Sequence, residues 1–462
     1  MYKDKNNSLK HENMLAQIKD KWSKSLMYNR LIGNLGQNKL KNIYIFYCIV
    51  YKIALDLIYV WVISPLYSYN GLVTDINLFK IVESYFLLIL STSTLELNKY
   101  KISSYYNVIL HSLTLIPLLC LYGVMDETRS FTYISTIAFI IIFYLSKKEL
   151  NLNKFKIKVG FRKFKKSINK SYTIAIVFVS SLTIVTYILL YKKVGFSINL
   201  NFSNIYDLRS SFSEVLKNSS IFRYLFVWQS NVLNMFLLGL FIIKKKYYGI
   251  GVVGILQLWL FSSNGSKTTF FNMAFCIVVI YIYIKKKEIY NFVKFILATQ
   301  LVTSFIYLIT KNINILGIAS YRLIYIPAQV AFYHNDFFQK NGFLHLSYSI
   351  MKRFIDYPYS IEPSRVIGVE YFNSINMNAN TNFLGDAYMN FGLLGIIVFS
   401  IAIGLTFNII NKISLKKNKL MCLSITITPI FLLTNGAFLT TILTYGLGIG
   451  ILLLLLMPNE VL

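Results

Sequence analysis

The sequence predicts an all-α integral membrane protein with about twelve transmembrane helices. Of its 462 residues, 55% are hydrophobic and only 14% are charged, whereas a soluble protein carries about 25% charged residues. Long apolar runs such as 139–145 and 451–457 lack the two-residue alternation of a membrane β-barrel strand. These observations exclude the soluble enzyme classes.

The individual spans are apolar runs close to the roughly 20 residues that a helix needs to cross a bilayer. They lie at 43–64, 78–95, 103–122, 131–146, 172–191, 221–243, 247–263, 268–284, 293–310, 387–411, 420–435 and 437–457. The polar first 42 residues contain no apolar core, so we expect no cleavable signal peptide. The organisation expected is a cytoplasmic basic tail at 1–42, nine spans within 43–310, a large extracytoplasmic loop at 311–386 and three spans within 387–462.

The basic residues test this count of spans. The chain has 47 Lys and Arg against 19 Asp and Glu, a net charge of +28. With a cytoplasmic N-terminus, roughly two thirds of the basic residues fall in segments on the inner side, as the positive-inside rule requires. Both termini are then cytoplasmic. Membrane topology accounts for most of the charge, and no nucleic-acid partner is expected.

The loop 311–386 is the largest segment outside the spans. Loops beyond about 15 residues are usually functional or disordered, and this one is too rich in Phe and Tyr for disorder. We expect it to fold against the outer face with short amphipathic helices, for example at 343–356.

The cations placed near the outer face are enriched in arginine, whereas lysine dominates inside. Four arginines lie in the two longest outer loops and one just inside the outer end of the sixth span: Arg209, Arg322, Arg353 and Arg365, and Arg223. The planar guanidinium grips phosphate oxygens with two hydrogen bonds, so this enrichment favours recognition of an anion. The alternative is that each arginine pairs with a nearby acid, such as Arg209 with Asp207 or Glu214.

Polar residues inside the spans have a structural and a functional interpretation. Lys52 with Asp56, and Lys80 with Glu83, are spaced to neutralise each other on one helix face, which we favour over ion coupling. His111 is expected to be a buried, hydrogen-bonded residue. Several amides are expected to hydrogen-bond between helices: Gln229, Asn231, Asn234, Gln257, Asn272 and Gln300. Four cysteines within spans are expected to be packing residues: Cys48, Cys120, Cys276 and Cys422.

No cofactor or metal ligand set can be found in the sequence. It has no Gly-rich phosphate loop, no His/Cys cluster with ligand spacing and no Asp-x-Asp pair. We therefore expect no cofactor and no metal, and any phosphate chemistry must rely on Arg and Lys.

One stretch at 380–395 is distinctive, with the sequence Asn-Thr-Asn-Phe-Leu-Gly-Asp-Ala-Tyr-Met-Asn-Phe-Gly-Leu-Leu-Gly. Gly392 and Gly395 within it would permit close helix contact. The stretch resembles the segment with a Gly-Glu-Ala-Tyr core and a following Asn-Phe-Gly in Wzy-type oligosaccharide repeat-unit polymerases, with Asp386 in place of Glu. The turn 262–267 is similar to their short Gly-Ser-Arg turn, with Lys267 in place of Arg.

This resemblance implies a GT-C-like, metal-independent glycosyltransferase of the bacterial cytoplasmic (inner) membrane. It would transfer a growing glycan from polyprenyl diphosphate to the next lipid-linked repeat unit at the outer face, giving a surface polysaccharide such as an O-antigen or capsule. The partners implied are the lipid-linked oligosaccharide, membrane lipids and a chain-length regulator.

The resemblance also assigns roles to residues. Asp386 is the preferred general base, with Glu370, His334 and His345 as alternatives. Arg209, Arg322 and Arg365 would stabilise the leaving diphosphate. The substrate-binding candidates are Arg223, Lys267, Arg353, Glu370, His334, Tyr321 and Tyr388. For the tyrosines, sugar stacking and interfacial packing remain alternatives.

Two other functions stay open. A flippase for the same lipid-linked oligosaccharide would suit the many spans and ion pairs, although transporters usually have two similar halves and no internal repeat is visible. An O-antigen-type ligase would share the layout and use a different acceptor.

Overall fold

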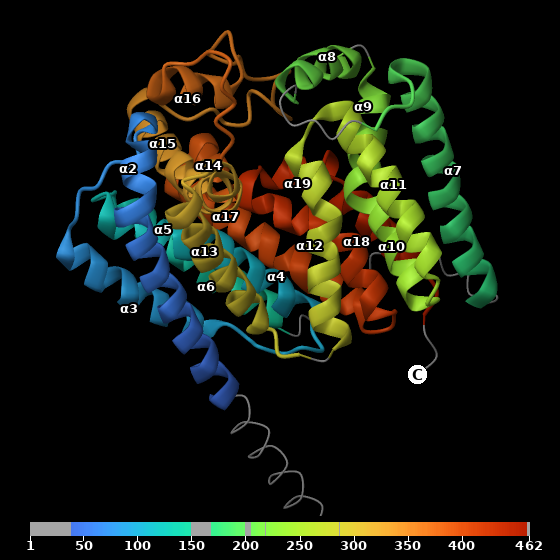
Figure 1. Cartoon of the computed structure of the whole chain (residues 1–462), viewed down its shortest axis with the longest axis horizontal. Coiled ribbons are helices and arrows are strands. Elements are labelled where there is room, and N and C mark those ends of the chain that lie inside the picture. Colours follow the sequence, from blue (N-terminus) through green and yellow to red (C-terminus); the bar gives the residue numbers. More distant parts are fainter. Residues whose placement is uncertain (1–37, 149–167, 199–204, 218, 286, 460–462) are drawn as a thin grey trace, which may run out of the picture.

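The computed structural model describes residues 38–148, 168–198, 205–217, 219–285 and 287–459. Within these ranges the chain is helical and forms no β-strand, only an isolated bridge between Asp75 and Met125 (Figure 1). The predicted basic tail at 1–42 falls largely outside the described residues. The all-α membrane class is confirmed.

Nine described helices are long and apolar enough to cross a membrane. They are Asn38–Asn70, Ile102–Val124, Arg129–Lys147, Thr173–Val194, Ser220–Ile243, Lys267–Ile284, Asn291–Thr310, Ile313–Asn341 and Phe383–Ser414. Eight of them coincide with predicted spans. The other predicted spans are α3 (Leu78–Thr94), α11 (Tyr247–Asn264), the 13-residue α18 (Lys419–Phe431), and a broken pair, α19 (Phe438–Leu443) with α20 (Leu447–Leu456).

The ninth candidate span, Ile313–Asn341, lies inside the predicted outer loop. It consists of α14 (Ile313–Leu316), the π-helical η7 (Gly317–Tyr325) and α15 (Ile326–Asn341). In Figure 1 this long helix runs nearly along the line of sight, across the direction of α12 (Lys267–Ile284) and α13 (Asn291–Thr310). The predicted loop therefore contains a long apolar helix that hydropathy assigned to no span.

The prediction of a helix at 343–356 is wrong. The described chain forms hydrogen-bonded turns over 345–354, and the next helix is α16 (Pro363–Phe372). His345 and Leu346 have φ values of 51° and 61°, which a right-handed helix does not allow. Their backbone N–H groups bond to α17 (Phe383–Ser414) instead of to a helical turn of their own.

The segments predicted to face the cytoplasm meet at one end of the molecule. Lys99 forms an ion pair with Glu288 at 2.9 Å, and the Lys419 ammonium lies over the Tyr100 ring. The Asn408 amide, near the end of α17, donates to the carbonyl of Lys148. The described Lys-rich connections at 96–101, 287–288 and 412–419 are thus at one end, as the alternation of loops predicts. This end, which is predicted to be the inner one, is at the bottom of Figure 1, opposite α8 (Ile205–Lys217) and α16.

Several spans contain a π-helical segment, and a proline often follows it directly. The segments Tyr59–Ile63, His111–Leu115 and Gly317–Tyr325 precede helices that carry Pro65, Pro117 and Pro327 in their first turn. Proline has no N–H and its ring clashes with the preceding turn, so the widened turn accommodates it. A fourth segment, η6 (Gln229–Leu233), lies between α9 (Ser220–Trp228) and α10 (Asn234–Ile243) without a proline.

Amides surround η6, and the predicted bonding between helices is confirmed. The Asn234 amide donates to Gln257 Oε1 of α11 at 2.7 Å and accepts from Gln229 Nε2 at 2.7 Å. The Asn272 amide of α12 donates to Asn231 Oδ1 at 2.8 Å. Elsewhere, Gln300 Nε2 donates to the carbonyl of Ala319.

The two predicted ion pairs have different outcomes. Lys52 and Asp56 pair at 2.8 Å as predicted, and Asp56 also accepts from Tyr85. The prediction of a Lys80–Glu83 pair is wrong, because Lys80 bonds to Asp126 at 2.7 Å.

Glu83 has other partners, since it accepts from the Tyr122 hydroxyl and lies 3.5 Å from Arg129. His111 is buried between Tyr44 and Ser91 as predicted. The four cysteines are also buried, as expected of packing residues.

Candidate functional site

The distinctive motif 380–395 forms the beginning of α17. Asn382 caps this helix by accepting hydrogen bonds from the backbone N–H groups of Leu384 and Gly385 at 3.1 and 3.2 Å. The same side chain donates to the carbonyl of Pro327 in α15. The cap therefore fixes both where α17 begins and how it lies against α15.

Asp386 lies in the first turn of α17 and is only 7% exposed. Within the described part of the chain, no hydrogen bond or ion pair to its carboxylate is found. A buried carboxylate without a partner is costly, and the helix N-terminus offsets only about 0.3–1 kcal/mol of that. Such a group is a candidate for a chemical role.

The α17 helix breaks one turn after Asp386. Gly392 has φ of 60° and ψ of −146°, and Phe391 is also non-helical. The break leaves the carbonyls of Met389 and Asn390 without helical partners, and they accept from the N–H groups of Leu344 and His345 at 2.9 and 3.1 Å. Gly392 thus produces a bend that holds the segment 343–346 against the motif.

Aromatic rings surround this bend. Tyr388 is 5% exposed, and its ring meets those of Phe343 and Phe131 edge to face. This geometry fits the packing interpretation of Tyr388 better than sugar stacking. His345 is exposed, and its ring lies 5.7 Å from Phe391, so among the described histidines it is the one that is both close to the motif and open to solvent.

Tyr445 is a neighbour of Asp386 that the sequence analysis missed. It lies in the break between α19 and α20 and interacts electrostatically with the Asp386 carboxylate. Its carbonyl accepts from Asn231 of η6 at 3.3 Å, and the next residue, Gly446, has φ of 94°. In the sequence, a Tyr-Gly pair interrupts the run 437–457 at the position of this break.

Two of the predicted cations meet at the 262–267 turn. Arg209 of α8 donates through Nε to the carbonyl of Gly265 at 3.1 Å, two residues before Lys267 begins α12. The structure thus connects Arg209 to the turn that carries Lys267.

Arg223 and Arg365 approach each other through Tyr348. Burial raises the pKa of the Tyr348 hydroxyl and Glu362 adds to this, while the positive charges of Arg365 and Arg223 oppose the rise. Arg365 also lies 3.4 Å from Glu362 and donates to Asn378. Pairing with an acid, the alternative interpretation of the outer arginines, therefore applies to Arg365.

Arg322 belongs to a different group of residues. It interacts electrostatically with Tyr67 and Tyr321, whose rings stack at 3.8 Å. Tyr321 also accepts a hydrogen bond from Asn70 at 2.7 Å. Tyr321 is therefore packed against the end of the first span.

An apolar groove of about 500 Å³ lies between the first span and α13. Trp61 and Val62 line it on one side, and Phe305 and Leu308 on the other. Tyr67, beside Arg322, follows Val62 by five residues. Arg322 is thus placed just beyond one end of this groove.

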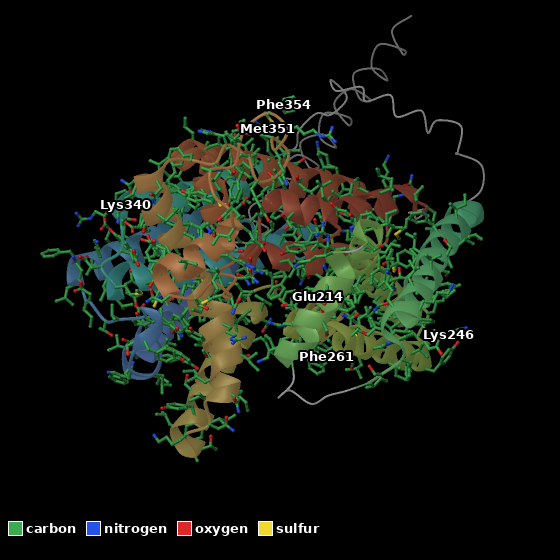
Figure 2. All side chains as sticks on the ribbon, turned by 90° about the horizontal axis from the view of Figure 1, so that it is seen from above. Glu214, Lys246, Phe261, Lys340, Met351 and Phe354 are labelled. Carbon is green, nitrogen blue, oxygen red and sulfur yellow. The ribbon has the colours of Figure 1, made fainter. Side chains whose placement is uncertain are left out.

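The remaining predicted site residues are dispersed. Arg353 is exposed in the turns after 345, and Glu370 is exposed on α16 beside Tyr371. His334 is 2% exposed inside α15 and hydrogen-bonds to the carbonyl of Val330, which fits a packing role. Seen from above relative to Figure 1, Lys340 of α15 and Glu214 of α8 lie well apart (Figure 2).

Among the residues that the structure describes, no group of His, Cys, Asp and Glu could hold a metal ion. Comparisons of the chain with family models, with curated proteins and with solved structures give no match.

Proposed function

We propose that this chain is a glycosyltransferase that polymerises oligosaccharide repeat units carried on polyprenyl diphosphate, at the outer face of a bacterial cytoplasmic membrane. The observation that carries the proposal is Asp386, a 7% exposed carboxylate without a partner among the described residues, in the motif that resembles repeat-unit polymerases. Folding alone gives no reason to keep such a group.

In the proposed reaction, a sugar hydroxyl of the incoming lipid-linked unit attacks the anomeric carbon of the growing glycan. Asp386 accepts the hydroxyl proton as the new C–O bond forms. The bond between the anomeric carbon and the diphosphate oxygen breaks, and the diphosphate leaves with the electron pair. Cations must stabilise the charge that accumulates on it.

Two groups of outer cations fit a reaction in which both substrates are lipid diphosphates. Arg209, Arg223 and Arg365 come from α8, α9 and α16, whereas Arg322 lies beyond the apolar groove between the first span and α13. We propose that one diphosphate binds at Arg322 with its polyprenyl chain in the groove, and the other binds at the first group.

The test is an in vitro polymerisation assay with purified protein and lipid-linked repeat units. Asp386→Asn keeps the shape and removes proton acceptance, so we expect turnover to fall by about 10²–10⁴-fold while binding of the lipid-linked donor persists. Asp75→Asn is the matched control, because Asp75 is an exposed acid in a short outer connection. Near wild-type turnover in Asp386→Asn would refute the assignment of the base.

A second set of variants tests the cations. Arg209→Lys and Arg365→Lys keep the charge and lose the planar fork, so we expect shorter polymer at normal protein level. Arg129→Lys is the control, since Arg129 lies 3.5 Å from Glu83 and is assigned to neither cation group. Full-length polymer in the alanine variants of Arg209, Arg322 and Arg365 would refute the proposal that these arginines bind the diphosphates.

The flippase and ligase alternatives are separated by deletion of the gene followed by electrophoresis of surface polysaccharide. A polymerase mutant leaves a product with a single repeat unit. A ligase mutant leaves the lipid anchor bare, and a flippase mutant retains its units inside the cell.

A further inference from the structure

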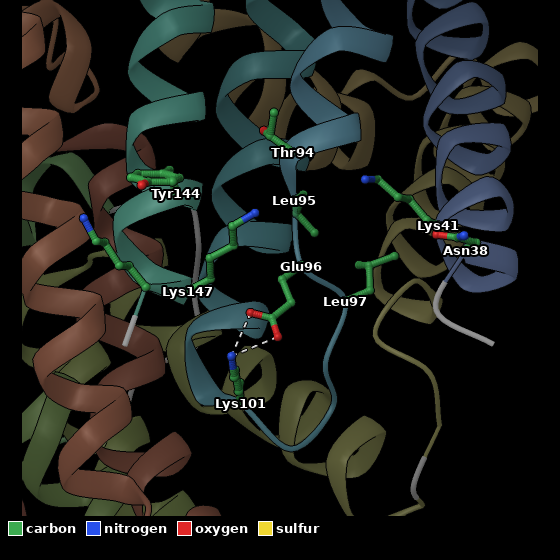
Figure 3. A pocket seen from close by; sticks show the side chains of 10 residues that line it. Asn38, Lys41, Thr94, Leu95, Glu96, Leu97, Lys101, Tyr144 and Lys147 are labelled. Atoms are coloured by element: carbon green, nitrogen blue, oxygen red, sulfur yellow. Dashed lines mark hydrogen bonds and ion pairs between the residues drawn. The ribbon is translucent and has the colours of Figure 1, made fainter. Parts of the chain in front are cut away.

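A cavity of about 480 Å³ opens at the inner end of the molecule, far from the motif 380–395. Three separate segments line it (Figure 3). They are the start of the first span with Asn38 and Lys41, the chain after α3 from Thr94 to Lys101, and the end of α6 (Arg129–Lys147) with Tyr144, Lys147 and Lys148.

The lining of this cavity is strongly basic. It contains Lys41, Lys101, Lys147 and Lys148, and its only acid among the described residues is Glu96. Glu96 is neutralised by Lys101, whose ammonium lies 2.9 Å from its carboxylate. Three positive charges are therefore left without a lining acid.

Two of these lysines converge from different helices. Figure 3 shows the side chains of Lys41 and Lys147 extending toward each other across the cavity, and the two ammonium groups are close enough to repel each other. A lysine at a helix C-terminus or an inner membrane face is ordinary. Two lysines that converge on one cavity despite their mutual repulsion are what a bound anion between them would require.

Part of the lining is apolar. Leu95 and Leu97 line the cavity, and so does the half-exposed Tyr144 ring, with the Lys148 ammonium 5.5 Å from its centre. Cations beside apolar side chains at the end of membrane helices match the headgroup, glycerol and first methylenes of a lipid. A free phosphate would make no use of the apolar part.

We propose that this cavity binds the phosphate of an anionic glycerophospholipid of the inner leaflet, between Lys41 and Lys147. Basic pockets between membrane helices on the cytoplasmic side bind such headgroups. The site is separate from the proposed glycosyl transfer and stands whether or not that proposal holds.

The test measures phospholipid retained by the purified full-length protein after exchange into nanodiscs of phosphatidylcholine and phosphatidylglycerol. Native mass spectrometry then reports the bound lipid. Each lysine near a membrane surface contributes about 1 kcal/mol, or roughly fivefold. Lys41→Gln with Lys147→Gln should therefore lower retained phosphatidylglycerol by about twentyfold or more, with phosphatidylcholine unchanged.

Two further variants make the result decisive. Lys285→Gln with Lys287→Gln removes the same charge from another inner connection that does not line the cavity, and should retain lipid as the wild type does. Lys41→Arg with Lys147→Arg keeps both charges and should also retain it. Equal loss in the Lys285 and Lys287 variant, or loss in the arginine variant, would overturn the proposal.

Inorganic phosphate separates the two possible sources of the anion. If lipid is the ligand, phosphate at millimolar concentration leaves the retained phosphatidylglycerol in place, because it lacks the apolar contacts. Complete displacement by phosphate would overturn the lipid assignment.

Discussion

Gly392 offers the sharpest test of how the motif is shaped. Its φ of 60° and ψ of −146° fall in a region that is essentially restricted to glycine, where another residue costs about 1–3 kcal/mol. A Cβ added there would lie 2.7 Å from the ring of Phe343, and such overpacking costs about 1–3 kcal/mol more. Gly392→Ala should therefore destabilise the protein by about 2–6 kcal/mol.

The four buried cysteines provide the assay. A thiol-reactive dye reports unfolding in detergent as they become accessible, and we expect the midpoint for Gly392→Ala to fall by several degrees. Gly251→Ala is the matched control, because Gly251 is in a helix and no heavy atom lies within 4 Å of its added Cβ. That variant should be neutral or stabilised by about 0.4–1 kcal/mol.

The two contributions can be separated. Phe343→Ala removes the ring that the new Cβ would meet, so adding it to Gly392→Ala should cost less than the sum of the single variants. The backbone contribution should remain. A Gly392→Ala protein with the midpoint of Gly251→Ala would refute the argument that this bend requires glycine.

Three further predictions concern other parts of the molecule. Burial raises the pKa of Glu127 to about 8 from 4.5, against the opposing charge of Lys80. The folded protein therefore holds a proton that the unfolded chain releases between these values, so stability falls as pH rises through this window, and Glu127→Gln should remove that part of the fall between about pH 5 and pH 8. An unaltered pH dependence in that variant would contradict it. Asn234→Leu leaves Gln257 Oε1 without the hydrogen bond that Asn234 donates and should lower the unfolding midpoint by the equivalent of about 1–3 kcal/mol. An unchanged midpoint would show that these amides do not contribute to stability. Asn376→Cys, at an exposed position, should react with an impermeant maleimide in intact spheroplasts while the buried native cysteines do not; reaction only after permeabilisation would place 342–382 inside.

Properties set by each residue's own segment could be predicted from the sequence. Hydropathy located eight of the nine long apolar helices, because the cost of exposing backbone and polar groups to lipid acts on each span separately. The same reasoning identified His111 and the amides around η6, since a polar group inside a span must find a partner.

Properties set by distant segments could not be predicted. Lys80 bonds to Asp126 rather than to Glu83. Asp126 is distant in the sequence, but it competes with Glu83, which is only one turn away on the same helix. Ile313–Asn341 contains Arg322, His334 and Asp336, which lowered its apparent hydrophobicity. Gly392 was expected to permit close helix contact, and it instead breaks the helix.

In the candidate site, too, the features set by a residue's own segment could be predicted and those set by distant segments could not. The motif around Asp386 could be located from its own residues, but Tyr445 could not, because the break between α19 and α20 brings it there. The outer arginines looked like one set, and the structure separates Arg322 from the others.

The π-helical segments have a consequence for how the length of the spans can change. Each residue of an α-helix turns the chain by about 100°, so deleting one from a regular span would rotate every later side chain away from its neighbours. A π-helical turn already contains one residue more than the α-helical path requires. Deleting one residue within Tyr59–Ile63 or His111–Leu115 would return that turn to α-helical geometry and leave both halves of the span facing as before. These turns are the positions where a tightly packed span can lose a residue and keep its contacts.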